Sequence, residues 1–180
     1  ERMRVCEDEY VIEPFEVREL IALAESEYGR CQSESVLFQQ ETHVRVPTRD
    51  DAIEETYAKL ETLIKRSGLT QDAASSFFYA VREAIDNARR HGNRQRTDCV
   101  IDILYLLDKE KITLTVRDEG QGFDYASEMT KAEEATPLQR ARDRLDDGGF
   151  GGLGIGLMMR CSDKVEYTPP GNIVKLTKYR

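Results

Sequence analysis

Hydrophobic residues recur along the chain at two spacings, which separate predicted strands from predicted helices. Residues 42–47 alternate between polar and apolar side chains, as in a strand with one buried face, and Pro47 ends the run. The next apolar residues fall three or four positions apart. This spacing predicts a helix that Asp50 or Asp51 caps and that continues to about Arg66.

A second helix follows, and after it most of the remaining chain is predicted to be strand. This helix begins at Thr70, whose hydroxyl can cap it, presents a broad apolar face and ends at Gly92. Later patterns predict one more helix at 153–162 and strands at about 98–107, 111–117, 164–168 and 172–178. Because helices and strands segregate, we expect an α+β fold, a sandwich with helices on one face of the sheet.

The first part of the chain differs from the rest in charge. Residues 1–45 hold 5 basic and 11 acidic residues, a net charge of −6 out of −8 for the whole chain. We therefore interpret residues 1–41 as an acidic N-terminal extension and residues 42–180 as the main domain. Within the extension, an apolar stripe over 14–29 predicts a helix, which either packs on the main domain or docks a partner or a second copy of the chain.

Residues 125–147 break the regular pattern of the main domain. They are polar and charged without a strong period, which predicts a long loop or lid. With the neighbouring glycines, the lid is expected to occupy residues 125–150.

Composition narrows the possible functions of the 180-residue chain. The acidic balance argues against nucleic-acid binding, because Lys and Arg must neutralise phosphates. No apolar stretch approaches the roughly 18 residues of a membrane span, and the N-terminus lacks a signal pattern, so we expect a cytoplasmic protein without membrane contact. Histidine chemistry is limited to His43 and His91, and the four cysteines lack the C-x-x-C spacing of a metal or redox site.

Glu83, Asn87 and His91 form the first candidate site. They recur four residues apart on the helix face opposite the apolar stripe. An amide oxygen such as that of Asn87 can bind Mg²⁺, which takes further ligands from water and phosphates. Glu83 could orient or deprotonate a nucleophile beside a terminal phosphate. The alternative interpretation of these residues is a solvated helix face.

Asp118, Gly120 and Gly122 form the second candidate site, directly after a predicted strand. A carboxylate at a strand end can accept a hydrogen bond from the amino group of adenine, where guanine would present an oxygen. The two glycines allow close backbone approach and positive φ. An ordinary strand-to-turn connection favours the same residue types and is the alternative.

The third candidate site is a glycine-rich stretch that leads into a helix. Six of the nine residues from 148 to 156 are glycine. Backbone N–H groups at such a helix start can bind phosphate. The stretch satisfies G-x-G-x-x-G, but a charged loop precedes it where a dinucleotide-binding fold requires a strand, so we reject that interpretation.

In this order the three motifs resemble those of the GHKL (Bergerat-fold) ATPases. Residues 83–87 look like the N box of that superfamily, 118–122 like its first glycine box and 152–156 like its second. The resemblance covers about residues 42–178 and implies a two-layer sandwich, with helices on one face of a mixed, mostly antiparallel sheet. It also implies that ATP and Mg²⁺ bind under a mobile lid.

Within that superfamily, the chain looks most like the bacterial anti-sigma-factor serine/threonine-protein kinases. The similarity is carried by residues 83–92, 152–158 and 176–179, which read EAIDNARRHG, GLGIGLM and LTKY. By resemblance, such a kinase binds a sigma factor in one state. In another state it phosphorylates a serine on a small antagonist (an anti-anti-sigma, STAS-like protein), and the family tends to form homodimers.

The resemblance implies a role for each matching position. Glu83 would be the catalytic base, Asn87 the Mg²⁺ ligand and Asp118 the residue that binds adenine. The other expected nucleotide-binding residues are His91, Gly120, Gly122, Gly152, Gly154 and Gly156.

Two positions depart from the family pattern. An arginine just before the second glycine box is replaced by Gly-Phe-Gly, and Arg140, Arg142 or Arg144 of the lid is a candidate substitute. Asn172 stands near the start of the final strand, where a threonine is common.

Two other functions remain open at this stage. The first is a non-catalytic switch module that binds a partner. The second is the ATP-binding domain of a sensor histidine kinase, which needs a phospho-accepting histidine on a dimerising helix. Neither His43 nor His91 fits that requirement.

Overall fold

The computed structural model describes residues 2–4, 10–12, 38–134 and 152–180. The chain divides into two compact units, Glu1–Leu37 and Phe38–Arg180. In the first unit, β1 (Arg2–Arg4) pairs antiparallel with β2 (Tyr10–Ile12). The helix predicted over 14–29 lies outside the described residues.

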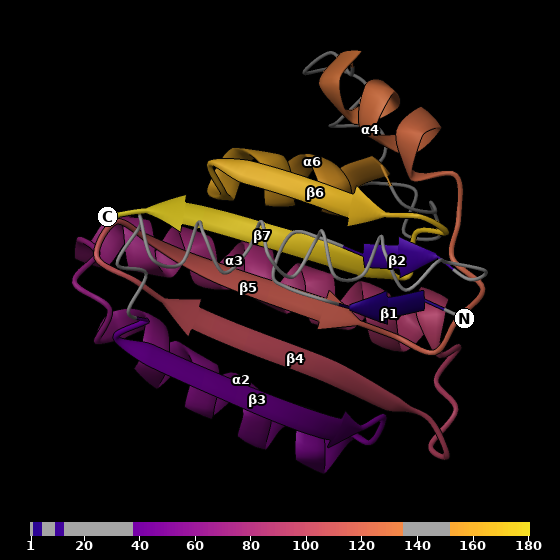
Figure 1. Cartoon of the computed structure of the whole chain (residues 1–180), viewed down its shortest axis with the longest axis horizontal. Helices are drawn as coiled ribbons and strands as arrows, with labels where there is room; N and C mark the ends of the chain where they lie inside the picture. The colour runs from indigo at the N-terminus through magenta and orange to yellow at the C-terminus, as the bar shows by residue number, and fades with distance from the viewer. Residues whose placement is uncertain (1, 5–9, 13–37, 135–151) are drawn as a thin grey trace. The chain divides into compact units, whose positions relative to one another are not determined.

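Five strands of the second unit form one sheet in the order β3-β4-β5-β7-β6 (Figure 1). Their bounds are Gln40–Pro47 for β3, Val100–Leu107 for β4, Lys111–Arg117 for β5, Lys164–Thr168 for β6 and Ile173–Tyr179 for β7. All four neighbouring pairs are antiparallel, where a mixed, mostly antiparallel sheet was expected. Because β7 also pairs with β5, the loop after β5 lies beside the turn that joins β6 to β7.

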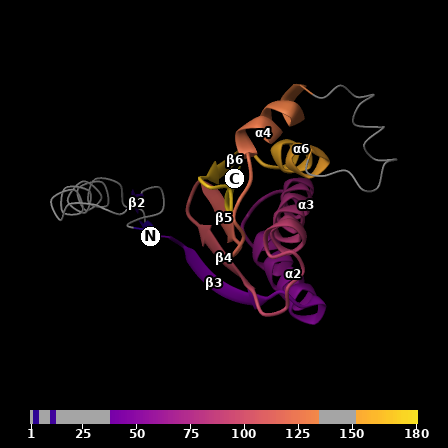
Figure 2. The ribbon, with the colours of Figure 1, turned by 90° about the vertical axis from the view of Figure 1, so that its right-hand side faces the viewer.

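The helices of the second unit cover one face of the sheet, as Figure 2 shows for α2, α3 and α6. Their bounds are Asp50–Lys65 for α2, Gln71–Asn87 for α3, Ala88–Gly92 for the π-helical turn η1, Tyr125–Glu134 for α4 and Gly152–Cys161 for α6. Fully buried side chains fill the space between helices and sheet, among them Leu60, Phe77, Ile85, Ile103, Tyr105 and Leu114. The expected two-layer α+β sandwich is confirmed.

The predicted cap of α2 was wrong by one residue. Arg49, with an extended backbone, occupies the N-cap position, and its carbonyl accepts a hydrogen bond from the Ile53 amide at 3.0 Å. Asp50 and Asp51 therefore lie in the first turn, where their charge favours the positive end of the helix dipole. Thr70 does cap α3, since its hydroxyl accepts a hydrogen bond from the Ala73 amide.

The expectation of a loop from residue 125 onward was also wrong for its first part, which forms α4. This helix packs against α6, with Ala132 buried and Met129 partly buried at the edge of the core. Burial of these two apolar side chains supports a helix that its charged composition obscures. Residues 135–151 lie outside the described part of the chain.

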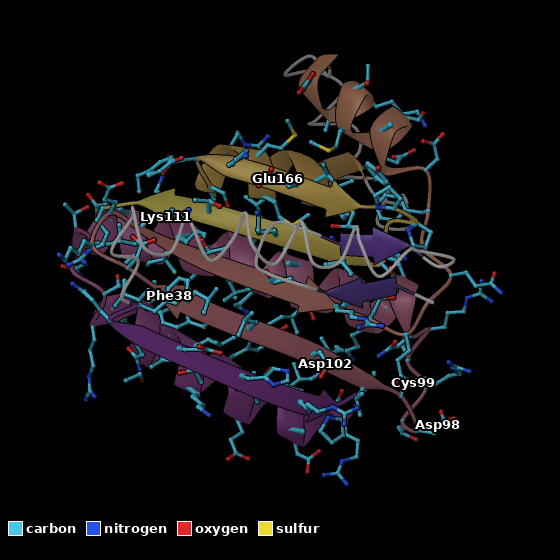
Figure 3. The ribbon with its side chains drawn as sticks, viewed as in Figure 1. Phe38, Asp98, Cys99, Asp102, Lys111 and Glu166 are labelled. Atoms are coloured by element: carbon cyan, nitrogen blue, oxygen red, sulfur yellow. The ribbon has the colours of Figure 1, made fainter. Side chains whose placement is uncertain are left out.

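The sheet face opposite these helices carries polar cross-strand contacts, and Figure 3 labels Asp102 and Glu166 on it. Asp102 of β4 accepts a hydrogen bond from Arg45 at 3.1 Å and lies 3.5 Å from the His43 ring. Glu166 of β6 forms an ion pair with Lys175 of the neighbouring β7 at 3.5 Å. Such contacts are typical of a face that is not part of the main core.

Candidate functional site

Helix α3 and the π-helical turn that continues it carry the first motif. Glu83 and Asn87 are half-buried, whereas the apolar side of the same helix faces the core. After Asn87 the helix changes from α-helical to π-helical hydrogen bonding. The Asn93 amide donates to the Ala88 carbonyl, five residues earlier, at 2.7 Å. π-Helical turns of this kind occur frequently at functional sites. Here the turn carries the exposed His91.

Glu83 and Asn87 of the first motif meet the glycine-rich helix α6. A Cβ atom added at Gly154 would overlap the Glu83 carboxylate and would lie 3.2 Å from Nδ2 of Asn87. Gly154 therefore allows α6 to approach α3 at the point where these two side chains emerge. Two motifs that are far apart in the sequence come into direct contact here.

The loop after β5 holds Asp118 by several hydrogen bonds. The Asp118 amide donates to the Asn172 carbonyl at 3.0 Å, and Nδ2 of Asn172 donates to the Asp118 carbonyl at 3.1 Å. The Gly120 amide donates to Oδ1 of Asp118 at 2.7 Å. These contacts fix both the backbone and the carboxylate at the end of the strand.

Close contacts in and around this loop explain three more glycines. A Cβ atom at Gly92 would overlap the Asp118 carboxyl group, and one at Gly120 would lie 2.7 Å from the Gly92 carbonyl. Gly122 has φ +78°, and its added Cβ would overlap the Pro170 carbonyl. Gly92 was expected only to end a helix, so its packing against Asp118 was missed.

These elements surround a cavity of about 620 Å³. Five of the predicted site residues line it: Asn87, His91, Asp118, Gly120 and Gly122. Gly154 contacts Glu83 and Asn87 instead, and Gly152 begins α6. Gly156 lies elsewhere, facing Arg160 and Ala132. A volume of this size is typical of sites for small molecules and nucleotides.

Several cavity-lining residues were not predicted as site residues. Phe123 follows the first glycine box, residues 118–122. Tyr167 comes from β6, and Arg94 and Arg96 come from the loop after the π-helical turn. Asn172 also lines the cavity, at the position where the sequence departs from the family pattern. These residues reach the site through strand pairing and turn geometry, which local patterns do not contain.

Burial changes the acidity of the groups around the cavity. It raises the pKa of the Asp118 carboxyl to about 6, although the Gly120 amide acts in the opposite direction. Burial likewise raises the pKa of Glu83, against the opposing charge of Arg90. The pKa of His91 is lowered, chiefly by desolvation and secondly by Arg90. Glu83 is thus a stronger proton acceptor than an exposed glutamate, and His91 favours its neutral form.

The combination of an α+β sandwich, a glycine-lined cavity at one end of the sheet and a half-buried aspartate at a strand end defines a nucleotide-binding domain. Residues 46–178 match the family described as histidine kinase-like ATPase domain. The chain belongs to this family, and the predicted resemblance is confirmed.

Known relatives narrow the class further. The serine-protein kinase RsbW of Staphylococcus aureus is 30% identical over 138 residues, which cover 76% of this chain and 84% of the relative. RsbW of S. aureus strain MRSA252 gives the same identity and coverage. A chain in the crystal structure of the SiaB-SiaC complex from Pseudomonas aeruginosa has a TM-score of 0.51 at 16% identity, covering 93% of this chain and 100% of that one. The latter likeness shows a shared fold.

The described residues contain neither a membrane-spanning helix nor a cluster of metal-binding side chains. Within the ranges that the structure describes, no helix is both long and apolar enough to cross a membrane. The same described residues hold no group of three or more His, Cys, Asp or Glu side chains that could bind a metal ion.

Proposed function

We propose that this protein is an ATP-dependent serine kinase that phosphorylates a small antagonist protein and sequesters a regulator, such as a sigma factor, by partner switching. The observation that carries the proposal is the meeting of Glu83, Asn87 and Gly154 beside the cavity that Asp118 lines. This arrangement puts a candidate proton acceptor and a candidate adenine-binding carboxylate at one nucleotide-sized site.

Each motif has a defined part in the proposed reaction. The Asp118 carboxylate accepts a hydrogen bond from the adenine amino group, and its fixed orientation follows from the Gly120 contact. His91, Gly120, Gly122, Gly152, Gly154 and Gly156 complete the expected nucleotide-binding set. Glu83 accepts the proton of the substrate serine while the serine oxygen bonds to the terminal phosphorus and ADP leaves with the electron pair of the broken bond.

The residues present fit Mg²⁺ as the metal that accompanies ATP. Asn87 lines the cavity and offers a neutral amide oxygen, and Mg²⁺ usually takes most of its other ligands from phosphates and water. Bound Mg²⁺ would neutralise the negative charge of the phosphates. Asn87 would be its protein ligand.

The assignment of partners rests on the relatives. One is named a serine-protein kinase, and the structural neighbour belongs to a complex of two proteins, SiaB and SiaC. An antagonist protein as substrate and a regulator as second partner follow from this kinship, and a homodimer is a further expectation. We also propose that residues 1–41 form an extension outside the kinase domain of residues 42–180, and that residues 125–150 form its lid.

The arrangement gives less support to a sensor histidine kinase. His43 lies in β3 and His91 in the π-helical turn after α3, so neither of the chain's two histidines lies on a dimerising helix. Phosphate bound to serine is stable in acid, whereas phosphohistidine is acid-labile. The two functions therefore predict different products.

The test uses ATP labelled on its terminal phosphate, Mg²⁺ and a soluble extract of the source organism. We expect acid-stable label on a protein other than the kinase itself, with the label mapped to serine. Glu83→Gln should reduce transfer by about 100-fold or more. Glu55→Gln, an exposed glutamate of α2, is the matched control. Acid-labile label on the chain itself, or full transfer by Glu83→Gln, would refute the assignment.

A further inference from the structure

Tyr167 is one of the residues on the cavity wall to which the motifs assign no role. It lies on β6, the edge strand of the sheet, and lines the cavity. Its ring is stacked on that of Tyr125, with centroids 5.6 Å apart and an interplanar angle of 19°. Phe123 meets the same ring edge-on at 5.3 Å. The two aromatic neighbours therefore fix the orientation of the Tyr167 ring.

The hydroxyl group at the end of this ring has no hydrogen-bond partner among residues 38–134 and 152–180, and the residue that carries it is half-buried at the cavity wall. Burial raises the pKa of Tyr167 well above its usual value, and the negative charges of Glu83 and Asp118 add to this effect. The hydroxyl group therefore stays protonated and is available as a donor. A donor at the cavity wall that has no acceptor among these residues can donate to a ligand that enters the cavity.

We propose that the Tyr167 hydroxyl donates a hydrogen bond to the sugar–phosphate part of the bound nucleotide. This inference rests on the proposed function and adds a binding residue to it. The hydroxyl is close enough to both Glu83 and Asp118 to be affected by their charges. Since Asp118 binds the base and Glu83 acts at the terminal phosphate, the ligand between them is the ribose and the inner phosphates, which carry mainly oxygen acceptors.

The chain offers a matched pair of substitutions for the test. Tyr167→Phe removes only the hydroxyl group and keeps the ring in the aromatic cluster. Tyr125→Phe makes the same change on the stacked neighbour, which does not line the cavity. The dissociation constants of ADP and ATP are measured by titration calorimetry for the wild type and both variants, and the unfolding temperature is measured without ligand.

We expect Tyr167→Phe to weaken ADP and ATP binding by the same factor, about five- to tenfold, as loss of one hydrogen bond predicts. Tyr125→Phe should bind both nucleotides within about twofold of the wild type, and both variants should unfold at the wild-type temperature. If Tyr167→Phe binds ADP as tightly as the wild type, or Tyr125→Phe loses as much affinity, this inference is wrong and the proposed function stands. If the wild type binds neither nucleotide, both are wrong.

Discussion

Replacing Asp118 with asparagine should stabilise the fold at neutral pH while it weakens nucleotide binding. The carboxylate is half-buried at the cavity wall, and burial raises its pKa from 3.8 to about 6. The raised pKa means that the folded protein binds this proton more tightly than the unfolded chain does. Ionisation of Asp118, which the proposed recognition of adenine requires, therefore lowers the stability of the folded protein.

The size of the effect follows from the shift in pKa. At about 1.36 kcal/mol per pKa unit, the shift corresponds to roughly 3 kcal/mol, and partial exposure to solvent reduces this to about 1–2 kcal/mol. The contribution of Asp118 to the free energy of unfolding is most favourable below about pH 4 and decreases as the pH rises to about 6, where the folded-state group ionises. Above that pH the full destabilisation is present.

The assay compares Asp118→Asn with the wild type in chemical denaturation at pH 4 and pH 8. We expect the variant to be about 1–2 kcal/mol more stable at pH 8 and nearly equal at pH 4. ADP binding should fall by about tenfold or more, because an amide donor replaces an acceptor opposite the adenine amino group. Asp98→Asn, at an exposed loop position that Figure 3 labels, is the control for charge removal.

Two results would refute this reasoning. A variant no more stable than the wild type at pH 8 would show that burial of the carboxylate does not oppose folding. An equal gain in stability at both pH values would mean that the effect comes from something other than ionisation. In the wild type, nucleotide affinity should also rise between pH 5 and pH 7 as Asp118 ionises, and a flat profile would argue against its contact with adenine.

Three further perturbations test the site and the core. Gly154→Ala should lower phosphate transfer by about 100-fold with little change in unfolding temperature, because the added Cβ would lie 2.9 Å from Cδ of Glu83 and displace the carboxylate. Transfer by Gly154→Ala at the wild-type rate would contradict this. Phe77→Ala should destabilise the protein by about 3–5 kcal/mol in denaturant unfolding, and the more exposed Phe38→Ala by far less. Mg-ATP should increase hydrogen-exchange protection in α4, and equal protection with and without it would oppose a lid that closes on nucleotide.

Sequence patterns predicted the elements of the main domain because each pattern is local. The alternation in β5 places Ile112 and Leu114 in the core, and the structure buries both. Thr70 caps α3 because its hydroxyl oxygen accepts a hydrogen bond from an amide of the first turn that has no partner within the helix. Prediction failed for α4, whose apolar residues Met129 and Ala132 are too few to give a period but become buried against α6.

The candidate site could be predicted only in part, since its motif residues are marked by spacing and its supporting residues are not. Asn93 is an example, fully buried beside the cavity. Its side chain donates to Thr48 and to the Val100 carbonyl, both at 2.9 Å, and accepts from the Glu119 amide at 2.9 Å. One asparagine thus ties together the end of β3, the start of β4 and the loop after β5. No pattern near residue 93 indicates these distant partners.

The glycines alone do not distinguish a kinase from a binding module that kept the fold. Gly92, Gly120 and Gly154 are each required by close packing, so a chain without enzymatic activity would need them as well. Glu83 and Asp118 differ in this respect, because burial makes the ionised form of each less favourable. The positive charge of Arg90 offsets this only in part for Glu83, whose pKa is still raised. A half-buried carboxylate of this kind lowers stability, which is expected where it serves proton transfer.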